Sequence, residues 1–272
     1  MPRLGRSMTM SFPPFAGLVR TLVLANVIIY FALLLLGAFS GQAASAITLL
    51  FSLTPTLVMR GYVFQVVTYA FIHGGLLHIL FNMLTLWFVG SYLEASQGTR
   101  WLREIYFISV IGAALCTIAI SYTHVLGMSP AQTTLGASGG IFGLLMAFAV
   151  LFGDQEFFMF PLPFSIKAKY LVAVYILIAV ASLFGGPAGT AYLAHLGGAL
   201  FGYLYVKFAP RRGFASAGSE TVFGLRNSYY RWKRKRASRK FEVYMRKETG
   251  EKSYRVPDEK GVKSPNDKRW MN

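Results

Sequence analysis

Six long apolar segments divide the chain, and they constrain its fold more than any other feature. They run from Leu18 to Ala38, Leu76 to Leu93, Leu102 to Ser121, Ser138 to Phe152, Tyr170 to Phe184 and Tyr192 to Phe208, and the fourth and fifth are short. A bilayer core of about 30 Å takes roughly 20 mostly apolar residues of helix. Because backbone groups in lipid must bond internally, these segments predict an all-α polytopic membrane protein with six transmembrane helices.

The region between the first two segments is apolar but interrupted. Residues Ala46 to His73 contain Pro55, Arg60 and Gly61, so we expect a structured interfacial first outer loop here instead of another span. An alternative concerns the start of the chain, where arginines, an apolar stretch and A-A-S-A at 43–46 resemble a cleavable signal peptide. Cleavage would leave five spans. The apolar stretch exceeds the usual length of about 7 to 15 residues, which favours a retained helix.

The cations predict the orientation of the chain. Of its 27 Lys and Arg residues, 18 follow residue 209, so the net charge of +16 belongs mainly to the tail. With the amino terminus inside, 26 of the 27 face the cytoplasm and Arg60 alone lies outside. We therefore expect both termini in the cytoplasm. The expected location of the protein is the inner (plasma) membrane of a bacterium.

The tail contains the basic run R-W-K-R-K-R-A-S-R-K at 231–240. A cytoplasmic cluster of this kind attracts anionic lipid headgroups, by about 1 kcal/mol per cation near the surface. Trp232, Tyr229 and Tyr230 are suited to the same interface. Binding to RNA is a weaker alternative, and we expect no nucleic-acid partner.

Other classes of function find little support in the sequence. The interiors of the six segments carry no Asp, Glu, Lys or Arg, whereas pumps and ion-coupled transporters usually need such groups. Cys116 is the single cysteine, which excludes an intrachain disulfide and a cysteine-based zinc site. We expect no cofactor.

A serine turn and a histidine carry the candidate chemistry. Ser138 lies in G-A-S-G-G at residues 136–140, at the head of the fourth segment, and His195 lies in the sixth. A serine hydroxyl needs a neighbouring base to act as a nucleophile, and histidine titrates near neutral pH. Small residues recur every four positions on both segments, which lets two membrane helices approach closely. These residues are Gly139, Gly143 and Ala147 on one segment, and Ala194, Gly198 and Gly202 on the other.

Hydrogen-bond donors for an oxyanion are also expected near Ser138. Glycines at 136, 139 and 140 free backbone N–H groups at a helix start, where the helix dipole favours negative charge. His78 and Asn82 are four residues apart and share a helix face, so they can add side-chain donors. His78 and Asn82 could instead form structural hydrogen bonds between helices, and Ser138 could be a simple helix cap.

The remaining histidine near this site is His73, which precedes Gly74 and Gly75 and which we expect to lie in the outer loop or to line a cavity. A metal site made from His73, His78 and His195 is an alternative. It lacks the H-E-x-x-H pattern of intramembrane metalloproteases, so we expect no metal.

Three motifs together resemble those of rhomboid intramembrane serine proteases. They are G-A-S-G-G at 136–140, A-H-L-G-G-A-L-F-G beginning at Ala194, and H-G-G-L-L-H-I-L-F-N ending at Asn82. The N-V-I-I-Y-F of the first segment and the six-span layout agree, so the resemblance covers about residues 20 to 208. It implies a rhomboid-like six-helix bundle that hydrolyses peptide bonds in or near the transmembrane helices of other proteins, with small side chains at the cleaved bond.

The resemblance also implies roles for individual residues. Ser138 would be the nucleophile and His195 the general base, without an acidic third member. Asn82, His78 and the Ser138 backbone N–H would form the oxyanion site, and Phe142, one turn after the serine, would stack on His195. The Trp-Arg pair frequent in the first outer loop of rhomboids is absent from residues 39 to 75.

The expected domains follow from this likeness. Residues 1–17 form a cytoplasmic amino-terminal segment, residues 18–208 the membrane protease domain, and residues 209–272 the basic cytoplasmic tail. A non-catalytic relative that binds membrane helices for trafficking or degradation is the alternative. Such relatives would be expected to have lost the serine or the histidine, and both are present here.

Overall fold

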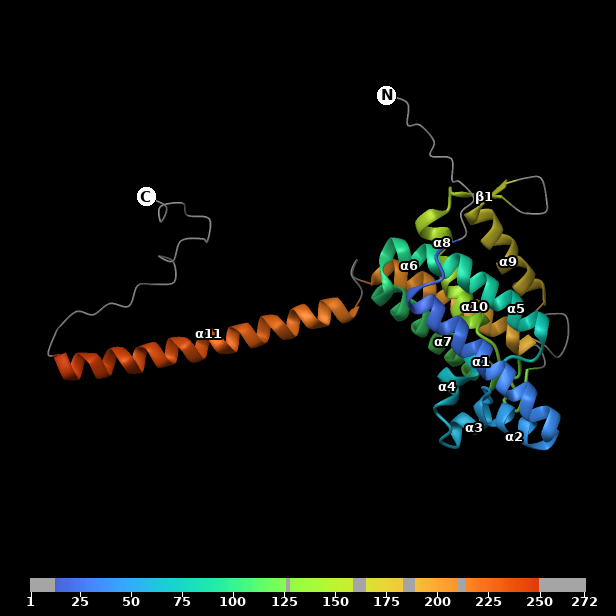
Figure 1. Cartoon of the computed structure of the whole chain (residues 1–272), viewed down its shortest axis with the longest axis horizontal. Helices are drawn as coiled ribbons and strands as arrows, with labels where there is room; N and C mark the ends of the chain where they lie inside the picture. The colour runs from blue at the N-terminus through green and yellow to red at the C-terminus, as the bar shows by residue number, and fades with distance from the viewer. Residues whose placement is uncertain (1–12, 126–127, 159–164, 183–188, 210–213, 250–272) are drawn as a thin grey trace, which may run out of the picture. The chain divides into compact units, whose positions relative to one another are not determined.

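The computed structural model describes residues 13–125, 128–158, 165–182, 189–209 and 214–249, most of which are helical (Figure 1). In chain order the helices are α1 (Gly17–Phe39), α2 (Gly41–Phe51), α3 (Pro55–Met59), α4 (Gln65–Thr68), η1 (Tyr69–Phe71), α5 (Leu76–Thr85), η2 (Leu86–Gly90), α6 (Ser91–Gln97), α7 (Thr99–Ser121), α8 (Ser138–Phe152), α9 (Ala168–Ser182), α10 (Gly189–Phe208) and α11 (Phe214–Thr249). The turn η1 is a 3₁₀ helix and η2 is a π-helix. Strands β1 (Glu156–Phe158) and β2 (Ser165–Lys167) form an antiparallel hairpin between α8 and α9.

Each of the six apolar segments coincides with a helix or a continuous run of helices. Within the described residues, α1, the run Leu76–Gln97 and α7 are long and apolar enough to cross a membrane. Helices α8 and α9 have 15 residues each, which gives them a length of about 22 Å, less than the thickness of a hydrocarbon core. The last two residues of the predicted fifth segment, 183 and 184, lie outside the described residues.

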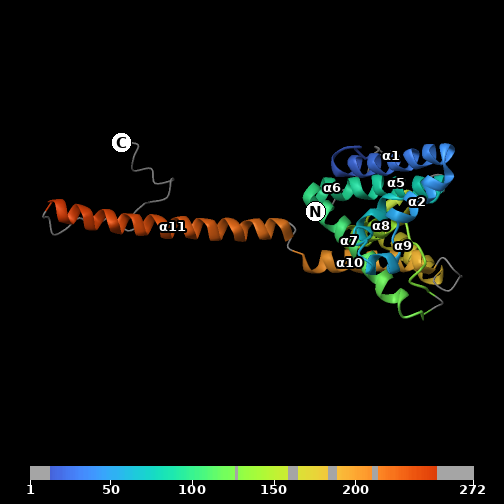
Figure 2. The same cartoon turned by 90° about the horizontal axis from the view of Figure 1, so that it is seen from below.

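The centre of the helical bundle consists of α7, α8 and α10, which pack against one another more extensively than the other described helices do (Figure 2). Helix α7 buries apolar side chains along its length, among them Leu102, Ile105 and Val110. Helix α8 is buried on most of its surface, including Leu144 and Phe148. The helices that carry Ser138 and His195 are therefore two of the three helices at the centre of the bundle.

Helices α8 and α10 touch through their glycines, as the matched small-residue stripes predict. A Cβ atom at Gly198 would overlap the Gly139 carbonyl group, and one at Gly202 would lie 2.5 Å from the Gly143 Cα atom. Backbone contacts of this kind leave no room for a side chain. The stripes are thus used for packing within the chain.

The start of α1 is held by Glu94 of α6, just after the second predicted span. The Glu94 carboxylate of α6 accepts the backbone N–H groups of Leu18 at 2.8 Å and Val19 at 3.1 Å. It also accepts the Thr99 hydroxyl at 2.7 Å. These N–H groups belong to the first turn of α1, which has no intrahelical partners for them and which favours negative charge. Glu94 therefore caps a helix that begins 77 positions before it in the sequence.

The predicted interfacial loop, Ala46 to His73, is ordered and contains short helices, and its first helix, α2, already begins at Gly41. Leu53 and Thr134 exchange two backbone hydrogen bonds, of 2.9 and 2.8 Å. Gln65 is fully buried and bonds the Leu50 carbonyl and the Thr54 N–H. The outer loop is thereby joined to the segment that leads into Ser138.

The basic tail contains one long helix. Helix α11 has 36 residues, and nearly all of it forms a compact unit separate from the bundle. The basic run at 231–240 indicates the charge of this region, whereas a helix is not among the expectations for it. Residues 250–272 of the predicted tail and residues 1–12 of the predicted amino-terminal segment lie outside the described residues.

Candidate active site

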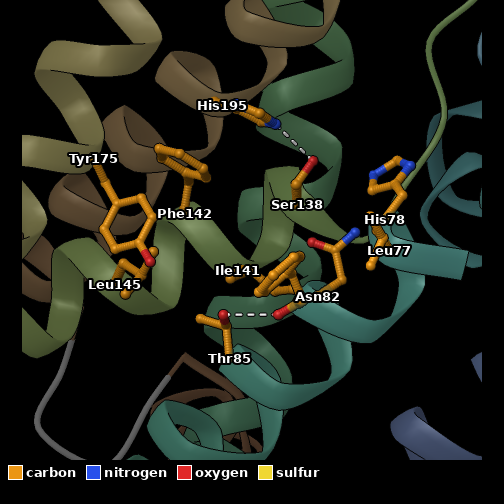
Figure 3. Close-up of a pocket in the computed structure, with 11 residues that line it drawn as sticks. Leu77, His78, Asn82, Thr85, Ser138, Ile141, Phe142, Leu145, Tyr175 and His195 are labelled. Carbon is orange, nitrogen blue, oxygen red and sulfur yellow. Dashed lines mark hydrogen bonds between the residues drawn. The ribbon is translucent and has the colours of Figure 1, made fainter. Parts of the chain in front are cut away.

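Ser138 is the first residue of α8, and its side chain meets His195 of α10 (Figure 3). The Ser138 Oγ and the His195 Nε2 are 2.8 Å apart, a hydrogen bond between residues 57 positions apart in the sequence. When Nδ1 of the imidazole carries the proton, Nε2 is free to accept the hydroxyl proton. The geometry brings together the two groups that a serine nucleophile and its base require.

Two aromatic rings restrain the His195 imidazole. Phe142, one turn after Ser138, stacks on it with a centroid separation of 4.3 Å and an interplanar angle of 6°. Tyr192 meets it edge-on, with centroids 5.7 Å apart. The stack is the arrangement that the family resemblance implies for Phe142. Both contacts limit rotation of the ring and keep Nε2 directed at Ser138.

The turn before Ser138 depends on a glycine. Gly136 has a φ of 120°, a conformation that side chains disfavour, and a Cβ there would lie 2.7 Å from the His78 Nε2 atom. Its N–H donates to the Tyr69 carbonyl at 2.9 Å. The next N–H, of Ala137, donates to the His73 Nε2 at 3.4 Å. The outer loop therefore supplies acceptors for two consecutive residues of this turn.

Asn82 and His78 project from α5 beside Ser138, as their spacing predicts (Figure 3). Asn82 is buried, and its Nδ2 has no hydrogen-bond partner among the described residues. The Cβ position at Gly136 lies 3.7 Å from that atom, next to the His78 ring. A buried amide without a partner is costly, so a donor left free at this place is suited to an oxygen that binds there.

These residues line a pocket of about 450 Å³ between α5, α8, α9 and α10. Its polar groups come from Ser138, His195, Asn82 and His78, and most of the remaining wall is apolar. The other lining residues are Leu77, Phe81, Thr85, Ile141, Phe142, Leu145 and Tyr175. The pocket thus combines an apolar wall with a few convergent polar groups, the usual composition of a small binding site.

His73 lies just outside this pocket, between η1 and α5, and it is buried. Its ring contacts the His78 ring edge-on, with centroids 5.1 Å apart. Burial, and secondarily the neighbouring His78, lowers the pKa of His73 to about 4, so its imidazole is neutral near pH 7. No group of three or more His, Cys, Asp or Glu side chains able to hold a metal ion is found in the described part of the chain.

Three tyrosines at the site, Tyr69, Tyr175 and Tyr192, are not among the predicted site residues. Tyr69 bonds Gly136 through its carbonyl, Tyr175 contacts Phe142 edge-on, and Tyr192 packs on His195. Only Tyr192 carries a local signal, because it lies three residues before His195 and so shares a helix face with it. The other two reach the site through the tertiary fold.

The fold and its apolar helices define an integral membrane protein built as a helical bundle. The family described as "Rhomboid domain" matches residues 60–212, more than half of the sequence. The chain belongs to the rhomboid family.

Similar proteins come from several kingdoms. The chain is similar to "Rhomboid protein 1, mitochondrial" of Saccharomyces cerevisiae, with 32% identity over 154 residues that cover 55% of this chain and 43% of that protein. It is similar to "RHOMBOID-like protein 4" of Arabidopsis thaliana, with 31% identity over 133 residues that cover 49% of this chain and 30% of the relative. It is also similar to "Rhomboid protease AarA" of Providencia stuartii, with 29% identity over 199 residues that cover 69% of this chain and 70% of that protein. The chain spans less than half the length of the yeast and plant relatives.

Proposed function

We propose that this chain is an intramembrane serine protease that cleaves peptide bonds in or near the transmembrane helices of other membrane proteins. The observation that carries the proposal is the 2.8 Å contact between the Ser138 Oγ and the His195 Nε2, inside a pocket that also holds the Asn82 Nδ2, which is unpartnered among the described residues. Membership of the rhomboid family, and a relative named as a protease, support the same reaction class.

In the proposed mechanism Ser138 attacks the carbonyl carbon of the scissile peptide while His195 takes the hydroxyl proton. His195 returns this proton to the leaving amine, which departs and leaves an acyl group on the Ser138 oxygen. A water molecule, deprotonated by His195, then releases the acyl group and restores the serine. The reaction balances without a cofactor or a metal.

The negative charge that develops on the substrate oxygen is stabilised by donors on two helices. The backbone N–H of Ser138 lies in the first turn of α8, where N–H groups lack intrahelical partners and the dipole favours an anion. Asn82 and His78 contribute side-chain donors from α5. One donor of this kind typically accounts for about 10²- to 10³-fold in rate.

The shortness of α8 gives water a route to the nucleophile. In this proposal α8, with 15 residues, starts below the membrane surface, and the pocket at Ser138 opens to the outer side. The substrate helix must unwind locally, because its carbonyl groups are otherwise hydrogen-bonded. Small side chains at the cleaved bond fit this approach.

We propose six transmembrane helices, with residues 18–208 as the protease domain and residues 1–17 and 209–272 as cytoplasmic segments. The distribution of Lys and Arg supports this orientation. The proposed location is the inner membrane of a bacterium.

The proposed second partner is the anionic surface of the cytoplasmic leaflet, bound by the basic tail. In α11 the side chains of Tyr229, Tyr230 and Trp232 are exposed, and Arg236 lies over the Trp232 ring at 5.4 Å. Aromatic and cationic side chains together suit a headgroup region. Liposomes with and without anionic lipid test this. The test compares the full chain with a chain that ends at residue 213. If anionic lipid increases liposome binding of neither protein, or of both to the same extent, the proposal is contradicted.

The test of the protease assignment uses two variants. Ser138→Ala and His195→Ala should each abolish cleavage of a transmembrane substrate while the protein remains inserted and folded. A fluorophosphonate probe should label the wild type and not Ser138→Ala. Cleavage that survives in either variant, or absence of cleavage and labelling in the wild type, contradicts the assignment and favours a non-catalytic helix-binding protein.

A further inference from the structure

We propose that His73 is a positioning residue that fixes the geometry of the oxyanion donors without touching the substrate. This inference rests on the proposed function and assigns to His73 a part in the same site. Two separate contacts carry it, one to the turn before Ser138 and one to His78.

The first contact orients the backbone that leads into the nucleophile. The His73 Nε2 accepts the Ala137 N–H at 3.4 Å, and the Tyr69 carbonyl accepts the preceding N–H of Gly136 at 2.9 Å. Two consecutive peptide planes are thereby held from the outer loop. The next N–H in the chain is that of Ser138, the proposed backbone oxyanion donor. Its direction follows from these two planes together with the backbone angles of Ala137, φ −71° and ψ −8°.

The second contact supports a side-chain donor. The rings of His73 and His78 meet edge-on with centroids 5.1 Å apart. The His78 Nε2 lies 2.7 Å from the Cβ position of Gly136, so this ring fills the space that the glycine leaves. His73 thus lies behind both His78 and the Ala137 peptide, and displacement of His73 would move two of the three proposed donors at once.

The acceptor role defines the tautomer of His73. An imidazole nitrogen that accepts a backbone N–H carries no proton, so the neutral ring must be protonated on Nδ1. The side chain is buried and neutral near pH 7. An imidazole that merely fills space could carry its proton on either nitrogen. The protonated nitrogen of His73 can therefore be measured to test the positioning role.

Two substitutions of His73 that differ by one methylene distinguish the loss of the hydrogen-bond acceptor from the loss of side-chain volume. In His73→Gln the side-chain oxygen reaches about as far as Nε2, whereas in His73→Asn it reaches only as far as Nδ1. We expect His73→Asn to lower kcat for cleavage of a transmembrane substrate by about 10- to 10²-fold, with KM changed less than about 2-fold, because misplaced donors act on the transition state. His73→Gln should stay within about 3-fold of the wild-type kcat. Equal kcat values for the two variants overturn the inference.

A double-variant cycle tests whether His73 acts through the oxyanion site. Combined with Asn82→Ala, His73→Asn should cost less than the product of the two single losses, because the site is already impaired. Losses that multiply overturn the inference. A wild type that neither cleaves nor is labelled overturns the proposed function instead, so the two failures are distinguishable.

The wild-type protein provides a readout that needs no variant to fold. In ¹⁵N NMR of histidine-labelled protein in micelles, His73 should show a protonated Nδ1 and an unprotonated Nε2. A proton on Nε2 at neutral pH overturns the inference, whatever the activity of the variants.

Discussion

Replacing Gly198 by alanine is expected to separate the proposed nucleophile from its base. An added Cβ would meet the Gly139 carbonyl carbon at 2.8 Å and its Cα at 3.1 Å. Carbon atoms in ordinary contact lie about 3.5 to 4.0 Å apart. Both partners are backbone atoms, so no side-chain rotation relieves the overlap. Helix α10 must therefore move away from α8 by about 0.7 Å or more.

The expected loss of activity follows from that displacement. The bond between the Ser138 Oγ and the His195 Nε2 is 2.8 Å long. An added shift of about 0.7 to 1 Å takes it to about 3.5 Å or beyond, where little of a hydrogen bond remains. A misplacement of about 1 Å costs about 10²-fold in rate. We expect Gly198→Ala to lower kcat/KM for a transmembrane substrate, and the rate of fluorophosphonate labelling, by about that factor.

A glycine elsewhere in a predicted span provides the matched control. At Gly37 in α1 the nearest atom to an added Cβ is the Ala44 Cβ at 3.7 Å, an ordinary contact. Gly37→Ala should keep activity within about 2-fold of the wild type, as substitutions without steric conflict usually do. If folded Gly198→Ala also cleaves and is labelled at the wild-type rate, the reasoning from backbone contact to catalysis is wrong.

Three further predictions concern other parts of the chain. Asn82→Ala should lower kcat by about 10²-fold, the size of one oxyanion donor, and an unchanged kcat removes Asn82 from the site. Glu94→Ala should lower the unfolding free energy in micelles by about 1 to 3 kcal/mol, because two N–H groups of α1 lose a charged acceptor; an unaltered unfolding curve contradicts the capping role. The hydrogen bond and the charge of Lys169 hold the pKa of the exposed Asp154 carboxyl below its ordinary value. Lys169→Met should raise the pKa of Asp154 in a ¹³C NMR titration, and a titration curve that does not move contradicts this cause. Because the pKa is depressed in the folded chain, any stabilisation by the pair is present at neutral pH and lost as the pH falls.

Much of the membrane domain could be predicted from local sequence. Helix α8 begins at Ser138 and ends at Phe152, as predicted, because glycines flank an uninterrupted apolar run. The contact of Ser138 with His195 was predictable from two matched glycine stripes, since only backbone approach explains small residues at a regular spacing of four.

Features that depend on distant parts of the chain could not be predicted in this way. The Glu94 cap joins residues 75 and 76 positions apart, and nothing near Glu94 marks α1 as its partner. The acceptors for the N–H groups of Gly136 and Ala137 come from Tyr69 and His73, and no residue near Gly136 indicates these partners. Helix α11 is different, because its Arg, Lys, Ala, Glu and Met residues are good helix formers, a local signal that its high charge obscured.

The placement of Ser138 and His195 on separate helices has a consequence for biosynthesis. His195 belongs to α10, the last apolar helix of the chain, and the turn before Ser138 is held by an outer loop that is synthesised much earlier. While the ribosome is still translating, a nascent chain that has inserted α8 has the Ser138 hydroxyl but not yet His195, its proposed base. The proposed dyad is therefore complete only when α10 has entered the bilayer beside α8.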